Sequence, residues 1–275
     1  MVSGFHGNTD PIMVALLLLS LYLLETGPAW LAGAMLGMAV NIKIVPVLFA
    51  PAIFLFLRGR KGVEFMAGAA AMFAIGSLPV LAEDPLLVGK HVFGYSPQSG
   101  MWGVSALILA LGKETGFQAY ARMAKAASLG LLTAASIWMN WRERRPPPLV
   151  QCGFLGFLLL AVTPGFGVQY LAWLVPWTCL LRFREALAFH VAGGVFLFAY
   201  YTRGAGGFPW YLANSAKTPV WNGSLILVGL VCWLVICFLA ILFGMRLRRT
   251  WLTADDTRRR DTPLRPIATK TSKMS

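Results

Sequence analysis

Apolar segments separated by short polar stretches occupy most of the chain between residues 12 and 244. A helix that crosses a bilayer needs about 20 mainly apolar residues. Of the whole chain, 57% is hydrophobic and only 13% is charged, whereas soluble domains carry about 25% charged residues. The sequence therefore predicts an all-α fold, a polytopic transmembrane helix bundle of about 8–10 membrane helices. The segments are 12–24, 29–42, 44–57, 63–82, 103–112, 118–139, 149–163, 169–181, 186–201 and 225–244.

Most of these segments are shorter than a full membrane span. Only 63–82, 118–139 and 225–244 reach the length of a spanning helix. Proline breaks a helix, but a bundle tolerates it where neighbouring helices or a cavity satisfy the freed backbone groups. Several helices are thus expected to be short or broken around a cavity. The interrupting prolines are Pro28, Pro46, Pro51, Pro164 and Pro176.

The net charge of +13 is concentrated in basic clusters at 58–61, 142–145, 182–184 and 246–249. Lys and Arg accumulate on the cytoplasmic loops of membrane proteins. We therefore expect these clusters on the cytoplasmic side, and we expect no nucleic-acid partner because no soluble domain is predicted. The chain divides into a transmembrane domain, 1–245, and a basic cytoplasmic tail, 246–275, which is polar and predicted to be disordered.

The course of the first segments has two interpretations. If 29–42 and 44–57 each cross the membrane, Lys43 and residues 6–10 are both external. If 29–57 is one broken span, the N-terminal residues are internal. We favour two crossings because a lysine is costly at mid-membrane and because the polar motifs then share one side.

The favoured topology gathers ionisable and aromatic side chains at the external face. Lysine and arginine bind phosphate, aromatic rings stack on sugar faces, and a carboxylate can act as a general base toward a sugar hydroxyl. Asp10 is the candidate catalytic carboxylate. The candidate substrate-binding residues are His6, Asn8, Lys43, Lys90, His91, Gln169, Tyr170 and Trp173.

Several of these candidates also have a simpler structural explanation. Asp10 precedes Pro11 and can cap the helix that starts there. Lys43 can extend its ammonium group to lipid headgroups. Trp102, Trp173, Trp210 and Trp221 can belong to an aromatic belt at the membrane surface.

The glycine-rich stretches and a search for known motifs indicate no further functional site. The stretch that starts at Gly68, and the pair Gly193-Gly194, are interpreted as helix-packing surfaces. The sequence contains no metal-binding spacing, nucleophile elbow, phosphate-binding glycine loop or dinucleotide fingerprint.

Three patches, in their order along the chain, resemble integral-membrane glycosyltransferases of the GT-C superfamily. They are His6-Gly7-Asn8-Thr9-Asp10-Pro11, the stretch 31–46 that contains Asn41-Ile42-Lys43, and the stretch 167–176 that contains Gln169-Tyr170 and Trp173. The closest similarity is to the polyprenyl-phosphate-mannose-dependent mannosyltransferases and the related bacterial glycosyltransferase family 87. The resemblance covers roughly residues 5–245.

This resemblance implies an extracytoplasmic active site in the plasma (inner) membrane, a polyprenyl-phosphate sugar donor and a lipid or glycan acceptor. It places Asn8, Asp10 and Lys43 in the donor pocket, with Gln169, Tyr170 and Trp173 near it. In the superfamily the catalytic base is an acidic residue in the first external loop. This chain starts after the place where that loop should lie, so we expect an N-terminally incomplete copy. The alternatives are that Asp10 shares the role or that the chain is inactive.

The resemblance leaves open whether the enzyme uses a metal cofactor. Some relatives use a divalent metal ion held by carboxylates and the donor phosphate, and here Asp10 with Glu83 or Asp84 would hold it.

A membrane transporter or lipid flippase is the second function class, and an inactive membrane subunit is the third. Transporters often contain internal repeats and polar groups at mid-membrane. The absence of a clear repeat and the gathering of polar residues at one face favour the enzyme.

Overall fold

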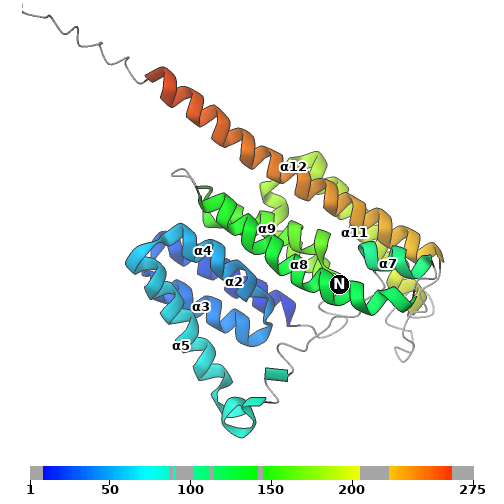
Figure 1. Ribbon diagram of the computed structural model, residues 1–275, viewed down its shortest axis with the longest axis horizontal. Helices are drawn as coiled ribbons and strands as arrows, with labels where there is room; N and C mark the ends of the chain where they lie inside the picture. Colours follow the sequence, from blue (N-terminus) through cyan, green and yellow to red (C-terminus); the bar gives the residue numbers. More distant parts are fainter. Residues whose placement is uncertain are drawn as a thin grey trace, which may run out of the picture.

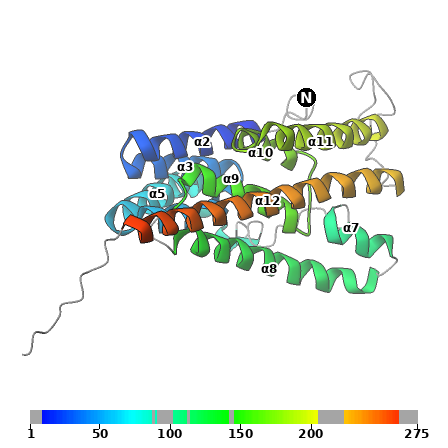
Figure 2. The ribbon, with the colours of Figure 1, turned by 90° about the horizontal axis from the view of Figure 1, so that it is seen from above.

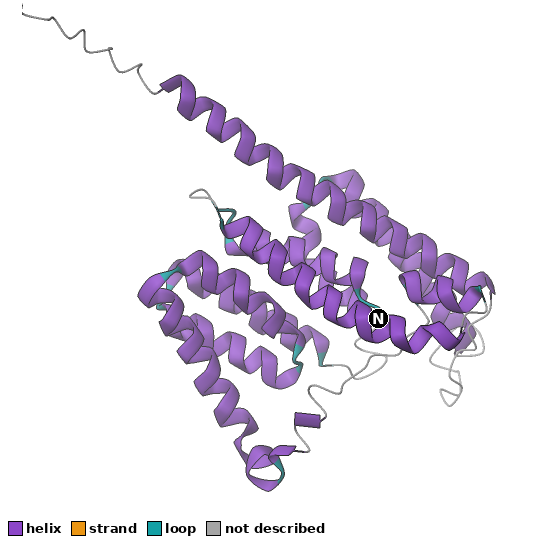
Figure 3. Ribbon diagram, viewed as in Figure 1, coloured by secondary structure: helices purple, strands orange, loops and turns teal. Residues whose placement is uncertain are grey.

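The computed structural model of the chain describes residues 9–86, 89–90, 102–111, 114–141, 145–204 and 223–261. The elements in this part are all helical (Figure 3), which confirms the predicted all-α fold. They are α2 (Asp10–Thr26), α3 (Ala29–Ile42), η1 (Val45–Phe49), α4 (Ala50–Leu57), α5 (Gly59–Glu83), α7 (Gly103–Ala110), α8 (Glu114–Asn140), α9 (Pro148–Val162), α10 (Tyr170–Leu174), η2 (Val175–Leu180), α11 (Phe183–Gly204) and α12 (Gly223–Asp261).

Two helices of the described residues are long and apolar enough to cross a membrane, Gly59–Glu83 and Gly223–Arg249. The predicted span 118–139 lies inside α8, whose polar residues, including exposed Arg122 and Lys125, lower its hydropathy. The remaining apolar helices are shorter. The chain is therefore a helical membrane protein with several short helices, as predicted.

Proline determines where several helices begin. Pro28 is the N-cap of α3 and separates it from α2. Pro46 lies in η1 and Pro51 lies in the first turn of α4, so the predicted segment 44–57 is split into a 3₁₀ part and an α part. Proline fits a first helical turn, where its missing N–H has no partner in any case. The prediction of broken helices is confirmed.

The helices form two groups around a central helix. Helices α2 to α5 pack together, α11 packs on α12, and α9 lies between the two groups (Figure 1). Helix α8 packs on α4 and α9 at the edge of the molecule (Figure 2). The long helices run roughly side by side when the molecule is turned (Figure 2). Residues 151–157 of α9 are all buried, and α9 contacts α2, α4, α8, α10 and α12. The core of the fold is therefore built around α9.

The backbones of helices α3 and α5 approach each other closely at glycine residues. A Cβ at Gly33 of α3 would overlap the carbonyl of Phe65, and a Cβ at Gly68 of α5 would overlap the carbonyl of Trp30. Small residues let helix backbones approach in this way, so the packing role predicted for Gly68 is confirmed. The same role is wrong for Gly194, because no described atom lies within 4 Å of the position of its Cβ.

The substitution Gly33→Ala is expected to lower the free energy of unfolding by about 1–3 kcal/mol, since the added methyl group pushes α3 away from α5. Thermal denaturation of the purified protein would measure the change. Gly130→Ala in α8 is the matched control, because nothing described lies within 4 Å of that Cβ. Alanine is also the better helix former there. Equal stability of the two variants would contradict the packing.

One end of the bundle collects the basic clusters. Arg58, after α4, donates a hydrogen bond to the carbonyl of Asn140 at the end of α8, with a distance of 3.0 Å. Arg145 donates to the carbonyls of Leu55 and Phe56, at 3.0 and 2.7 Å. Burial lowers the pKa of the Arg145 guanidinium, with a further contribution from nearby Arg58. Arg58 and Arg145 thus tie the end of α4 to the end of α8 and the start of α9.

The other two basic clusters meet at the same end. Arg246 of α12 forms an ion pair with Glu185 of α11, and a Cβ at Gly153, near the start of α9, would contact Leu180 at the end of η2. The described members of the four clusters therefore lie at one end, as the topology predicts, and the cytoplasmic orientation of that end stays a prediction. Helix α12 continues to Asp261, past the predicted start of the tail at residue 246. Residues 262–275 of the tail lie outside the described part.

Candidate functional site

An ion pair between Asp10 and Lys43 joins the start of α2 to the end of α3. Asp10 lies in the first turn of α2 and its side chain is 0% exposed, whereas Lys43 is the C-cap of α3 and its side chain is 26% exposed. The partial positive charge of a helix N-terminus favours a carboxylate, and the partial negative charge of a C-terminus favours an ammonium group. The antiparallel packing of α2 and α3 thus brings two favourable helix ends together.

The position of Lys43 distinguishes the two interpretations of segments 29–42 and 44–57. Lys43 lies at the same end as Asp10, while η1 and α4 lead from Lys43 to Arg58 at the basic end. Segments 29–42 and 44–57 therefore run in opposite directions. This agrees with the two-crossing interpretation rather than with one broken span.

Asn41 fixes the last turn of α3 against α5. Its amide donates a hydrogen bond to the carbonyl of Met72 at 3.0 Å and accepts one from the Ser77 hydroxyl at 2.7 Å. Helix α3 ends at Ile42, and Lys43 has an extended backbone. Asn41, two residues before Lys43, thus ties the end of α3 to α5, which the sequence did not reveal.

Helix capping by Asp10 and extension of Lys43 to lipid headgroups do not explain the observed positions of these two side chains. Thr9, rather than Asp10, is the N-cap of α2, and Thr9 makes no side-chain capping hydrogen bond. Lys43 points its ammonium group at a buried carboxylate. Ionisable pairs within a membrane bundle mark substrate or ion sites by default, so the pair is the centre of the candidate site.

Aromatic rings border the ion pair. The Nζ atom of Lys43 lies 5.7 Å from the ring centroid of Trp173, a distance at which a cation is attracted to the face of the ring. Tyr170 stacks on Trp173 with centroids 4.0 Å apart. Trp102 and Trp173 are only 1% and 7% exposed. The aromatic-belt alternative is therefore wrong for these two residues, because both rings pack inside the protein. Trp210 and Trp221 lie outside the described residues.

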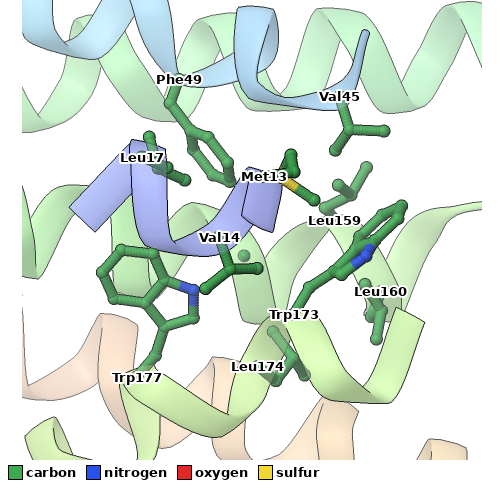
Figure 4. Close-up of a pocket in the computed structure, with 11 residues that line it drawn as sticks. Met13, Val14, Leu17, Val45, Phe49, Leu159, Leu160, Trp173, Leu174 and Trp177 are labelled. Carbon is green, nitrogen blue, oxygen red and sulfur yellow. The ribbon is translucent and has the colours of Figure 1, made fainter. Parts of the chain in front are cut away.

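An apolar pocket adjoins the ion pair (Figure 4). It has a cavity volume of about 20 Å³, and its walls come from α2, η1, α9, α10 and η2. Met13 and Val14 lie one helical turn after Asp10, and Val45 follows Lys43 by two residues, so the pair and the pocket are continuous. Other lining residues include Phe49, Leu160, Trp173 and Trp177.

The pocket residues could have been found only partly from sequence. Met13 and Val14 follow Asp10 at the three- and four-residue spacing that puts side chains on one helix face. Trp177 follows Trp173 by four residues in the same way. Their apolar character gave no chemical signal, so the sequence analysis did not include them.

The other predicted site residues do not all lie beside the Asp10–Lys43 pair in the described part of the chain. Gln169 is the N-cap of α10, and its side chain covers Gly167. Lys90 is exposed, and within the described residues no ion pair links it to the Asp10–Lys43 pair. Three predicted residues lie outside the described part of the chain, His6, Asn8 and His91.

A metal site is not assembled by the part of the chain that the structure describes. Within it, no three His, Cys, Asp or Glu side chains are close enough to hold a metal ion. Glu83 and Asp84 lie at the exposed end of α5, whereas Asp10 is buried. The divalent metal ion therefore stays a prediction.

Comparison with known proteins gives a family and a distant relative. The model of glycosyltransferase family 87 matches residues 3–164, a range that contains Asp10 and Lys43 and ends before Tyr170 and Trp173. A stretch of 77 residues is 33% identical to GPI mannosyltransferase 1 of Schizosaccharomyces pombe and makes up 28% of this chain and 21% of that protein. The chain thus spans about a fifth of the length of this curated relative. No solved structure matches.

Proposed function

The chain belongs to glycosyltransferase family 87, and we propose that it transfers a mannose-like hexose from a polyprenyl-phosphate sugar to an extracytoplasmic lipid or glycan acceptor. The S. pombe relative is a mannosyltransferase by name, which supports mannose as the sugar. We place the protein in the plasma (inner) membrane with its C-terminal tail in the cytoplasm. The basic end of the bundle supports that orientation, because basic residues accumulate on the cytoplasmic side.

The observation that carries this proposal is the continuity of the Asp10–Lys43 pair with the apolar pocket. A lipid phosphate has the same two parts in the same order, an anionic head and an apolar chain. A partly exposed lysine binds a phosphate as a point charge, and an apolar wall next to it accepts hydrocarbon. A water-soluble nucleotide sugar has no group that would use the pocket.

The lengths of α2 and α3 support a site at the depth of a lipid headgroup. Helix α2 has 17 residues and α3 has 14, which at 1.5 Å per residue correspond to about 26 and 21 Å. The hydrocarbon core of a bilayer is roughly 30 Å thick. A site at the ends of these helices therefore lies near the boundary of the hydrocarbon core, where the phosphate of a lipid donor also lies.

In the proposed reaction the acceptor hydroxyl attacks the anomeric carbon of the sugar. The bond between that carbon and the phosphate oxygen breaks, and the lipid phosphate leaves with the electron pair. Negative charge grows on the phosphate, so the ammonium group of Lys43 stabilises the transition state electrostatically. The hydroxyl proton passes to a carboxylate base.

Asp10 fits a positioning role for Lys43. Its carboxylate is fully buried and ion-paired, so it orients the ammonium group and would accept a proton only after the pair separates. The predicted role of Asp10 as the base itself is a distinct hypothesis, and the kinetics of Asp10→Asn separate the two.

A transfer assay tests the function. The full-length protein, reconstituted in liposomes with lipids of its source membrane as acceptors, is given polyprenyl-phosphate [¹⁴C]mannose or GDP-[¹⁴C]mannose. We expect label to move to a new product only from the lipid donor. Label from GDP-mannose alone would contradict the proposal. Passage of the lipid donor across the bilayer without sugar transfer would instead support the flippase alternative.

A further inference from the structure

The indole N–H of Trp173 is a buried hydrogen-bond donor for which the described residues supply no acceptor. Trp173 is 7% exposed. Buried polar groups in proteins almost always have a partner, and each exception calls for an explanation. Two other indoles of this chain follow the rule, because Trp102 and Trp233 donate to the carbonyls of Leu160 and Ala161, both at 2.9 Å.

The side chains that line the pocket beside Trp173 offer few polar partners to a buried water molecule. A buried water needs two to four polar neighbours to compensate for leaving bulk solvent. The pocket beside Trp173 is lined by aliphatic, aromatic and methionine side chains. The indole nitrogen lies on the ring edge that faces other lining side chains (Figure 4). An acceptor carried in by a ligand fits this position better than a resident water.

The second observation is the cation over the same ring. The Nζ atom of Lys43 is 5.7 Å from the centroid of Trp173, so a charged donor lies over the face of the ring whose edge carries the neutral donor. A phosphate group has several acceptor oxygens and can bond both donors at once. A neutral headgroup such as an alcohol has one oxygen and no charge to engage Lys43.

We propose that Trp173 donates a hydrogen bond from Nε1 to a phosphate oxygen of the lipid donor while Lys43 binds the same phosphate. Trp173 is then a specificity-determining residue that selects an acidic lipid over a neutral lipid of the same chain. This inference rests on the lipid-phosphate ligand of the proposed function and deepens it by assigning a distinct role to one atom.

Access to the indole nitrogen requires a small movement of the pocket wall, because the atom is covered in the structure. Met13 lines the same pocket, and methionine is the most adaptable of the apolar side chains. A shift of its flexible thioether would widen the pocket beside Trp173 without a change in the helices.

The variant Trp173→Phe tests the proposal, since it removes the N–H and keeps an aromatic ring. Binding of tritiated polyprenyl phosphate, tritiated polyprenol and ³²P-labelled inorganic phosphate is measured on the full-length protein in nanodiscs. We expect Trp173→Phe to weaken polyprenyl phosphate binding about tenfold, as for a lost hydrogen bond to a charged group, and to leave polyprenol binding unchanged. Trp177→Phe, in the same pocket, is expected to affect both lipids equally.

Two results would overturn the inference. Equal changes, or no changes, in the binding of the two lipids by Trp173→Phe would show that the ring only packs. Inorganic phosphate bound as tightly as the lipid would show that the source of the phosphate is not a lipid. If polyprenyl phosphate binds as expected and the transfer assay gives no product, the proposed function fails while the role of Trp173 stands.

Discussion

Replacement of Lys43 by methionine is expected to lower kcat/KM for a polyprenyl-phosphate sugar by at least about 100-fold. Methionine keeps an unbranched apolar stem and removes the charge. The ammonium group acts on charge that grows on the leaving phosphate, and the loss of one such electrostatic donor costs about 10²–10³ in rate. Steady-state kinetics with the lipid donor in liposomes measure the effect. Lys43→Arg, which keeps the charge, is expected to retain part of the activity.

Stability must be separated from activity in this experiment. Lys43→Met removes the cation from a buried carboxylate, which costs about 3–5 kcal/mol of folding free energy in comparable pairs. The double variant Lys43→Met with Asp10→Asn has neither charge and is expected to fold like the wild type and still show a kcat/KM at least about 100-fold lower. Arg60→Met is the matched control, because Arg60 is 92% exposed in its pair with Glu64 and such surface pairs contribute little. Wild-type rates in a folded double variant would contradict the role of Lys43.

Asp10→Asn is expected to raise the KM for the lipid donor by about 10–100-fold, with a smaller fall in kcat. The reason is that an amide no longer holds the ammonium group of Lys43 in place, so binding of the phosphate suffers most. A general base contributes typically 10²–10⁴-fold to the rate, and its loss would appear in kcat with little change in KM. Kinetics at varied donor concentration distinguish the two.

The pH profile gives an independent readout of the same variant. Loss of a general base would remove the acidic limb of the kcat profile, whereas loss of a positioning residue leaves the shape of that profile intact. A fall in kcat alone, together with a lost acidic limb, would make Asp10 the base and contradict the positioning role. Unchanged kinetics would exclude both.

The fold was largely predictable because helix boundaries follow local chemistry. The predicted segment 29–42 coincides with α3, since Pro28 precedes it and Lys43 with Pro46 follows it. The end of α12 at Asp261 was not predictable from hydropathy, because a charged helix can continue past the apolar core. Trp102 was misjudged because an aromatic residue near a membrane surface and one buried in a bundle have the same sequence signal. The two cases are distinguished only by the packing of Trp102 on Phe166, whose ring centroids lie 3.8 Å apart.

The site was predictable as a set of residues but not as a geometry. Ionisable residues in apolar surroundings identified Asp10 and Lys43, and topology placed them on one side. Their ion pair depends on the antiparallel packing of α2 and α3, which is a tertiary feature. The role of Asn41 and the pocket walls at Met13 and Trp177 required the structure as well, since apolar and amide side chains carry no specific chemical signal.

Photo-crosslinking of the donor lipid tests the central claim most directly. A polyprenyl phosphate with a diazirine on the isoprene unit next to the phosphate is bound to the full-length protein, irradiated, and mapped by mass spectrometry of peptides. The site predicts label on peptides that contain Met13 to Leu17 and Trp173 to Trp177, and loss of that label when unmodified polyprenyl phosphate competes. Label confined to the outward faces of α5 or α12, or unaffected by the competitor, would contradict it.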